Sequence, residues 1–192
     1  MWFARDARIQ LIPLESPPKT LCFTFLATKF GQMMMCVTKH ATVDSKDNFA
    51  ICVLHFVDKS VEKTYEEVRK RWSKSELQKD DATTQLVANK FFGNDKENSK
   101  AIPIAILGTE FQLSVWRALA DLTTGETCTY SQLAERMGRP SAIRAVANAV
   151  AKNEVAILIP CHRIVSQNGA SKYHWGADLK QQLLAFEKSS NY

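Results

Sequence analysis

The sequence lacks any apolar run that approaches the roughly 18 residues needed to cross a lipid bilayer. Its N-terminal segment, MWFARDARIQ, lacks the basic region followed by an apolar region that marks a secretory signal peptide. Hydrophobic residues make up 45% and charged residues 23% of the chain, which is usual for a globular protein. We therefore expect a soluble protein inside the cell, in the nucleus if the source is eukaryotic and otherwise in the cytoplasm.

The chain also has no CxxC pair, and its cysteines are odd in number. The five are Cys22, Cys36, Cys52, Cys128 and Cys161. An odd count without a signal peptide argues against a disulfide scaffold. The first three, with His40 and His55, are enough ligands for a zinc ion, but cysteines in strands are more often small core residues. We expect no required cofactor and no metal, with a structural zinc in the N-terminal half as the less favoured alternative.

A large excess of one charge is missing too. Lys and Arg number 25 against 20 Asp and Glu, so the net charge is +5. Residues 1–107 carry 16 basic and 13 acidic residues, and residues 108–192 carry 9 and 7, so the excess is spread over both halves. This balance permits a polyanionic partner without requiring one. The basic run VRKRWSK, residues 68–74, is most simply the solvated face of a helix.

Patterns in the first half predict a small α/β domain. Short apolar segments rich in Phe, Val and Ile predict three strands, over residues 20–27, 31–38 and 49–57. Helical spacing and boundary residues predict helices over residues 60–74 and 80–92. The polar stretch GNDKENSK, ended by Pro103, indicates a linker near residues 93–103. The prediction is a three-stranded antiparallel sheet with helices in residues 1–103.

The second half, residues 104–192, has the layout of a helix-turn-helix. A short helix over residues 130–137 is closed by Gly138, and a longer one follows over residues 141–152. The second helix carries small residues on one face, Ala142, Ala145 and Ala149, which cannot read base edges in a major groove but can approach a narrow minor groove. Arg144 is the long polar side chain among them, and it could insert where a base has left the stack. The alternative is a packed core face with a surface charge.

Cys161 has unusual neighbours for a core cysteine. The apolar run VAILI, residues 155–159, leads through Pro160 to Cys161, His162 and Arg163. A thiolate is the nucleophilic form of cysteine, and nearby positive charge lowers the pKa of a thiol. His162 could serve as the base, directly or through a water, with Glu187 from the last predicted helix, residues 179–188, to orient it. The alternative is an inert buried thiol.

Four segments together resemble the O6-alkylguanine-DNA alkyltransferases, the methylated-DNA–protein-cysteine methyltransferases. They are GTEFQLSVW (108–116), TYSQLAERMGRPSAIRAVANAVAKN (129–153), IPCHRIV (159–165) and KQQLLAFE (180–187). The likeness covers about residues 104–188. It implies an α+β fold: a ribonuclease-H-like N-terminal domain, residues 1–103, and a mostly helical DNA-binding and alkyl-acceptor domain, residues 104–192.

The resemblance implies direct-reversal DNA repair. Cys161 takes the alkyl group from O6 of a flipped guanine, and also from O4 of thymine, in a single irreversible turnover. His162 relays the proton through a water with Glu187 behind it, Asn153 shapes the turn before the site, and Tyr130 donates to N3 of the guanine. The carbonyls of Cys161 and Ile164 accept the exocyclic amine. Arg144 fills the gap in the duplex.

The resemblance also implies sets of contacting residues. DNA contacts are assigned to Tyr130, Ser131, Gln132, Arg139, Ser141, Ala142, Arg144, Ala145 and Asn148. The substrate pocket is assigned to Ala156, Ile164, Tyr173, His174 and Trp175. Ala156 stands where some relatives have proline and Trp175 where some have glycine, so we expect methyl groups to be accepted well and benzyl groups poorly.

The expected partner is double-stranded DNA containing O6-alkylguanine, bound by a monomer. A non-catalytic protein of the same fold that binds alkylated bases is the main alternative, and Cys161 argues against it. A helix-turn-helix transcription regulator is disfavoured because the second helix lacks base-reading side chains. A cysteine hydrolase is disfavoured because its base is normally remote in sequence from the nucleophile.

Overall fold

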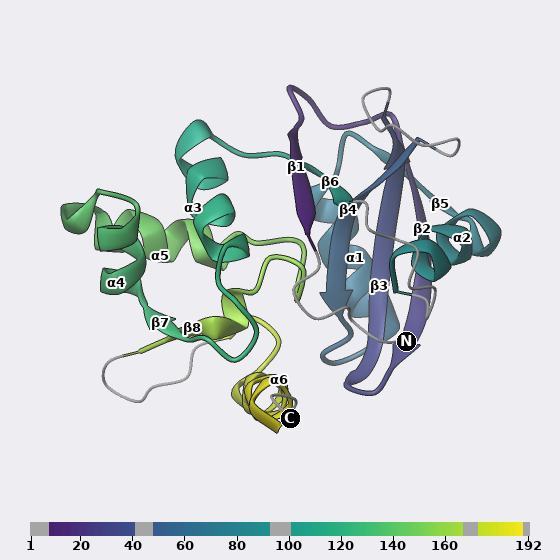
Figure 1. Ribbon diagram of the computed structural model, residues 1–192. Helices are drawn as coiled ribbons and strands as arrows, with labels where there is room; N and C mark the ends of the chain where they lie inside the picture. Colours follow the sequence, from purple (N-terminus) through teal and green to yellow (C-terminus); the bar gives the residue numbers. More distant parts are fainter. Residues whose placement is uncertain (1–7, 41–47, 93–100, 167–172, 190–192) are drawn as a thin grey trace. The chain divides into compact units, whose positions relative to one another are not determined.

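The computed structural model describes residues 8–40, 48–92, 101–166 and 173–189 (Figure 1). The chain forms two compact units, Met1–Leu107 and Gly108–Tyr192. The division falls beyond the predicted boundary at residues 103 and 104, because Pro103 lies inside a strand of the first unit. Residues 93–100 of the predicted linker lie outside the described residues. Of the helices in the described ranges, none is long and apolar enough to span a membrane.

The first unit contains one mixed sheet with the strand order β1-β6-β4-β3-β2-β5 (Figure 1). The strands are β1 (Ile9–Pro13), β2 (Thr20–Thr28), β3 (Gly31–Lys39), β4 (Phe49–Phe56), β5 (Glu76–Lys79) and β6 (Ile102–Ile106). Antiparallel pairing joins β2 to β3 and β3 to β4, whereas β1, β5 and β6 add parallel pairs. The prediction of a three-stranded antiparallel sheet is therefore wrong: those strands form the middle of a larger sheet.

Local chemistry explains why the other strands gave no clear signal. Strand β6 carries Pro103, which lacks the backbone N–H that a central strand normally donates, and proline usually argues against such a strand. Its pairing with β4 is correspondingly short, because only Ile51 and Ile104 are in register there. Strand β5 is a short polar segment, ELQK, at the edge of the sheet. Pairing with distant strands, and not local pattern, holds these segments in the sheet.

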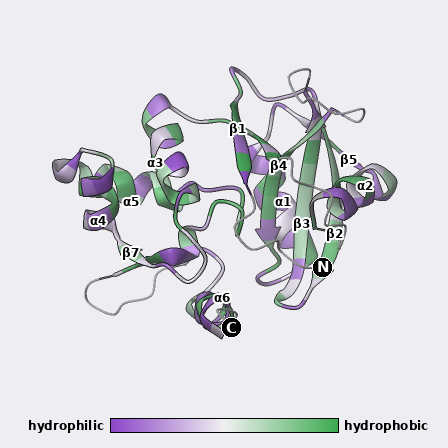
Figure 2. Cartoon of the chain, in the orientation of Figure 1, coloured by the Kyte–Doolittle hydropathy of each residue, from purple (hydrophilic) through white to green (hydrophobic). Residues whose placement is uncertain are grey.

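The core of the first unit lies along β3 and β4. Residues from Met33 to Val37 and from Ala50 to Leu54 have no exposed surface, so both faces of these strands are covered. Figure 2 shows the resulting hydrophobic colouring of the two strands. Helix α1 (Val61–Arg71) contacts β4, and helix α2 (Asp81–Phe92) contacts β2 and β3. Both helices match the predicted segments to within three residues at each end.

The second unit is mostly helical. Its elements are α3 (Glu110–Ala120), β7 (Cys128–Thr129), α4 (Tyr130–Arg136), α5 (Ile143–Ala151), β8 (Ile164–Val165) and α6 (Ala177–Ser189), with 3-10 turns at Pro140–Ala142 and Cys161–Arg163. Helix α3 packs against α4 and α5. The buried indole N–H of Trp116 donates to the carbonyl of Ala149 at 3.0 Å. Ala149 is therefore on the core side of α5, and its assignment to one face with Ala145, which is exposed, is wrong.

Helix α4 ends at a glycine that adopts a left-handed conformation. Gly138 has φ +68°, and the N–H groups of Gly138 and Arg139 donate to the carbonyls of Glu135 and Ala134. This pattern satisfies the last carbonyls of the helix and turns the chain toward α5. A methyl group at residue 138 would meet no atom within 4 Å, so only backbone strain opposes a side chain there.

We predict that Gly138→Ala lowers the free energy of unfolding by about 1–2 kcal/mol, the cost of a left-handed non-glycine residue. Gly138→Asn should lose less, because asparagine tolerates this conformation better. Urea unfolding of the three proteins measures the difference. Equal losses for the two variants would show that backbone strain is not the cause.

Candidate active site

Cys161 begins a 3-10 turn at the end of a tightly folded loop. The predicted apolar run before it is buried as expected, since Val155, Ala156 and Ile159 have no exposed surface, but it forms successive turns and not a strand. Ile157 in this loop has φ +70°, a conformation that is costly for a β-branched residue. Cys161 itself is 8% exposed. Strain of this kind persists only where the surrounding contacts fix the backbone.

Asn153 supplies those contacts. Its side-chain amide Nδ2 donates to the carbonyl of Ile159 at 2.8 Å and to Sγ of Cys161 at 3.1 Å. Its Oδ1 accepts from the N–H of Val155 at 3.0 Å. One buried side chain thus closes the loop between the end of α5 and the thiol, and it also touches the sulfur directly.

A buried carboxylate organises the residues after Cys161. Glu187 on α6 contacts His162 Nε2 at 2.8 Å and accepts three hydrogen bonds from Arg163, the shortest at 2.8 Å. It also accepts from the N–H of Gly125 at 3.2 Å. Arg163 further donates to the carbonyl of Leu122 and to Thr124 Oγ1. The sequence predicted that the charge of Arg163 acts on the Cys161 thiol. In the structure, the guanidinium of Arg163 is bound to Glu187.

The Glu187 contact fixes the tautomer of His162. Burial would raise the pKa of Glu187, but hydrogen bonds from His162 and Arg163 outweigh it and lower that pKa to about 2. Because a carboxylate only accepts, Nε2 of His162 must carry the hydrogen. Burial lowers the pKa of His162, so the ring is neutral at pH 7 and Nδ1 has a free lone pair. Nδ1 is buried and has no hydrogen-bond partner in the described part of the chain.

The Cys161 thiol is protonated in this resting arrangement. Burial raises its pKa to about 11, and the hydrogen bond from Asn153 and the charge of Lys180 offset this only in part. The expectation that neighbouring positive charge lowers the pKa of this thiol is therefore wrong for the resting protein. Desolvation dominates, and the site needs a base to take the thiol proton.

Lys180 is a residue of this site that sequence reasoning missed. It lies on α6, is 3% exposed, and donates through Nζ to the carbonyl of Ile164 at 2.5 Å. Its spacing from Leu183 and Glu187 puts it on the buried face of that helix, a signal the sequence did contain. The carbonyl of Ile164 keeps a second lone pair, so it can accept one more hydrogen bond.

Aromatic side chains surround the thiol. Tyr130 begins α4, is half-buried, and has its pKa raised by burial and by the proximity of Cys161. The Tyr173 ring lies edge-on to His162 and to Trp175, at centroid distances of 6.5 and 5.2 Å. Trp175 is 5% exposed and His174 is exposed. Ala156 is fully enclosed and offers no surface to a ligand in this arrangement. The expected preference for methyl over benzyl groups stays a prediction.

The residues assigned to DNA contact lie at the α4 and α5 end of the unit. Ser141, Arg144, Ala145 and Asn148 are exposed, as is Arg139, whose guanidinium lies 5.4 Å from the centre of the Phe111 ring. Ala142 is partly exposed. Ser131 and Gln132 instead bond to Thr129, the cap of α4. The site therefore combines an enclosed thiol with an exposed polar and basic surface.

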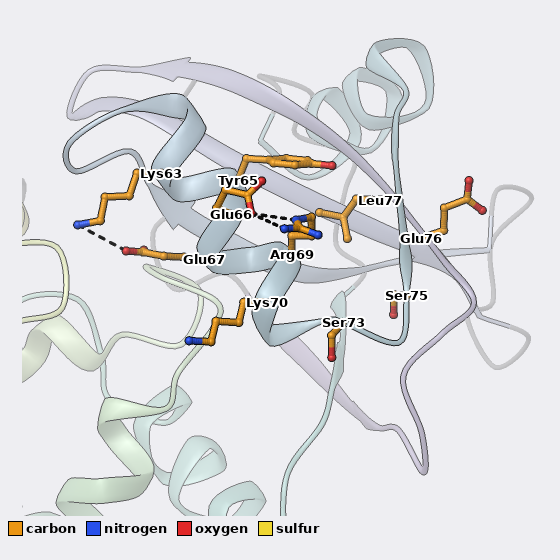
Figure 3. Close-up of a pocket in the computed structure, with 10 residues that line it drawn as sticks. All are labelled: Lys63, Tyr65, Glu66, Glu67, Arg69, Lys70, Ser73, Ser75, Glu76 and Leu77. Carbon is orange, nitrogen blue, oxygen red and sulfur yellow. Dashed lines mark hydrogen bonds and ion pairs between the residues drawn. The ribbon is translucent and has the colours of Figure 1, made fainter.

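The described part of the first unit contributes a charged surface groove and cysteines that lie apart from one another. A surface groove of about 830 Å³ over α1 and β5 is lined by charged side chains (Figure 3). Ion pairs neutralise part of it, Arg69–Glu66 at 2.7 Å and Lys63–Glu67 at 3.8 Å. Among the described residues no three His, Cys, Asp or Glu side chains gather to hold a metal, and all five cysteines are free. Cys22 and Cys36 point to opposite faces of the sheet, because Cys36 pairs with Phe23.

The chain is similar to known proteins of one family. Residues 110–189 match the family described as 6-O-methylguanine DNA methyltransferase, DNA binding domain. The inducible methylated-DNA–protein-cysteine methyltransferase of Bacillus subtilis is 36% identical over 137 residues, 70% of this chain and 76% of the relative. The chain belongs to the methylated-DNA–protein-cysteine methyltransferase family.

Other members show how far the likeness extends. The bifunctional transcriptional activator and DNA repair enzyme Ada of Escherichia coli is 48% identical over 95 residues, 49% of this chain but 27% of Ada. The matched part of this chain therefore spans about a quarter of the length of that relative. The crystal structure of the Mycobacterium tuberculosis O6-methylguanine methyltransferase is similar with a TM-score of 0.65 and 26% identity, over 90% of this chain and 96% of that one. The same protein in complex with DNA gives 0.58 and 26%, over 87% and 92%.

The buried carboxylate of Glu187 should make the free energy of unfolding depend on pH in the acid range. The pKa of Glu187 is depressed in the folded protein, so its stabilisation is present above about pH 4.3, the unfolded value, and is lost as pH falls toward about 2. Glu187→Gln should therefore cost about 3 kcal/mol at pH 7 and little near pH 2. Urea unfolding between pH 2 and 7 measures this gap. A gap that stays constant with pH would contradict the role of the ionised carboxylate.

Proposed function

We propose that this methyltransferase repairs DNA by moving an alkyl group, chiefly methyl, from O6 of guanine to Sγ of its own Cys161, with O4 of thymine as a second substrate. The observation that carries the assignment is the buried array of Asn153, Cys161, His162 and Glu187. It holds a protonated thiol and a base with a free Nδ1 in the same enclosed loop. Family membership supports the activity, and the array supports the assignment of residues.

The chemical step follows from the protonation states. The thiol proton passes through a water to Nδ1 of His162, and Glu187 stabilises the imidazolium that forms. The sulfur electron pair then forms the S–C bond while the C–O6 bond breaks, and its electron pair remains on the guanine. The Tyr130 hydroxyl donates a hydrogen bond to N3 of the guanine anion, which takes one proton from solvent. His162 returns the thiol proton to solvent, so the protons balance. The product is a thioether.

The reaction consumes the protein. A thioether has no good leaving group, and nothing among the described residues of the site supplies the chemistry to hydrolyse it. One molecule of protein therefore repairs one base, which fits a nucleophile that is not regenerated. Tests of this activity must use protein in amounts comparable to the damaged DNA.

The base must leave the duplex before the thiol can reach it, which costs a few kcal/mol. We propose that α4 and α5 form a helix-turn-helix that binds double-stranded DNA from the minor groove. The exposure of Arg144 and Ala145, and the partial exposure of Ala142, support this orientation. Arg144 fills the gap left by the base, while Arg139, Ser141 and Asn148 contact the backbone. The complex of the Mycobacterium tuberculosis protein with DNA supports DNA as the partner.

We further propose that the protein acts as a monomer without a metal, in the nucleus if the source is eukaryotic. The carbonyls of Cys161 and Ile164 accept the exocyclic amine of guanine. Lys180 supports this by fixing the direction of the Ile164 carbonyl. The first unit is proposed to be the ribonuclease-H-like domain of the family.

Incubation with a duplex that contains O6-methylguanine should add one methyl group to the protein, mapped to Cys161 by peptide mass spectrometry. Cys161→Ala should gain none, because the nucleophile is gone. Cys128→Ala is the matched control, since burial also raises the pKa of that thiol but it lies on β7. Binding of the duplex without any mass change would overturn the transfer and favour a non-catalytic binding protein.

Arg144→Ala should slow methyl transfer from the duplex about tenfold, a loss of about 1.4 kcal/mol of transition-state stabilisation. Transfer from free O6-methylguanine base should be unaffected, because no gap needs filling. Arg117→Ala, which removes an exposed charge from α3, is the control for net charge. Single-turnover rates on both substrates decide the question, and equal losses on duplex and base would contradict the role of Arg144.

A further inference from the structure

Two large hydrophobic side chains of the described residues are strongly exposed: Leu86, at 63%, and Ile143, at 42%. A single exposed apolar residue is ordinary and needs no explanation. Ile143 differs because of its location. It is the first residue of α5, and Arg144, the residue proposed to enter the duplex, follows it directly. Leu86 lies on α2 of the other unit.

The neighbours of Ile143 are small. Ser141, Ala142 and Ala145 flank it along the chain, so Ile143 and Arg144 are the two long side chains at this end of the helix. Val146, Ala149 and Val150 form the buried face of α5, and Arg144 lies on the opposite face. Ile143 precedes Arg144 by one residue, so it lies about 100° around the helix from Arg144. It is in line with Val146 and Val150, at the exposed start of that row.

Ile143 leaves apolar surface outside the core. Its exposed fraction is 42%, and isoleucine is a poorer helix former than alanine. The first turn of α5 also has no side-chain cap that Ile143 could complete. Ile143 is therefore an exposed β-branched side chain next in sequence to the arginine that is proposed to contact DNA, and it is available for a role in DNA binding.

We propose that Ile143 is an apolar wedge that enters the minor groove beside Arg144 and unstacks the base step next to the flipped nucleotide. The inference rests on the proposed function, which brings the start of α5 to the minor groove. Isoleucine is among the side chains that act in this way on kinked DNA. Its single preferred rotamer in a helix means that little side-chain entropy is lost on insertion.

Arg144 and Ile143 then have different roles in base flipping. Arg144 occupies the space that the base leaves, and Ile143 covers the apolar sugar and base edge that the opened step exposes. The contribution of Ile143 depends on buried apolar area and not on charge. Its loss should therefore affect duplex substrates alone and should leave the salt dependence of binding unchanged, since no phosphate contact is removed.

The test compares Ile143→Ala and Ile143→Val with the unchanged protein. Single-turnover methyl transfer from an O6-methylguanine duplex should slow about tenfold for alanine and about twofold for valine, because valine removes one of the three side-chain carbons that alanine removes. Transfer from free O6-methylguanine base should not change. The slope of log affinity against log salt on the duplex should also stay the same, whereas Arg144→Ala should reduce it by about one. Leu86→Ala, the other exposed hydrophobic residue, should match the unchanged protein throughout.

Different outcomes contradict different statements. If the unchanged protein methylates Cys161 from the duplex and Ile143→Ala is as fast, the wedge is wrong and the proposed function stands. Equal slowing on duplex and free base would mean that Ile143 acts on the thiol site, and a shallower salt slope would mean a phosphate contact; either result overturns the wedge. If the unchanged protein transfers no methyl group from the duplex, both proposals fail. Urea unfolding midpoints of the variants confirm that each one is folded.

Discussion

The ionised carboxylate of Glu187 joins three separate parts of the second unit. It binds two consecutive residues of the Cys161–Arg163 turn, and it accepts from the backbone of Gly125 in the segment between α3 and β7. An unpaired buried carboxylate would be strongly unfavourable, and so would an unpaired Arg163, so neither partner is independent of the other. The pair holds α6 against the turn and leaves Nδ1 of His162, the proposed base, without a hydrogen-bond partner among the described residues. The position of the turn, the tautomer of His162 and the packing of α6 thus all depend on the carboxylate of Glu187.

The loop before the turn contributes the second half of the site. Asn153 satisfies two carbonyls and the thiol with one amide, which allows the chain to pass through the left-handed conformation at Ile157. The sulfur of Cys161 is therefore held from the α5 side, and His162 is held from the α6 side. This separation explains why the proposed nucleophile and the proposed base can be sequence neighbours and still have different environments.

Sequence predicted the parts of this molecule that depend on local pattern. The middle strands β2, β3 and β4 and the helices α1 and α2 follow from short-range periodicity. The likeness of 159–165 to an alkyltransferase motif predicted roles for Cys161 and His162, which are both buried in one 3-10 turn. Strands β1, β5 and β6 could not be found in this way, because parallel pairing with distant segments forms them. The pKa of the thiol was predicted in the wrong direction, since desolvation depends on the folded surroundings and not on adjacent residues. The helical spacing of Lys180 did indicate a buried position, but its partner, a backbone carbonyl on another element, could not be predicted from local pattern.

The attachment of α6 to the turn also has a consequence for the order of events during synthesis. Cys161 leaves the ribosome before Glu187, because the helix that orients its base comes later in the chain. Until that helix docks, His162 has no carboxylate to select its tautomer, and Arg163 has no buried counter-charge. The proposed transfer therefore requires the last described helix to be folded onto the turn, since that helix carries the carboxylate that orients His162.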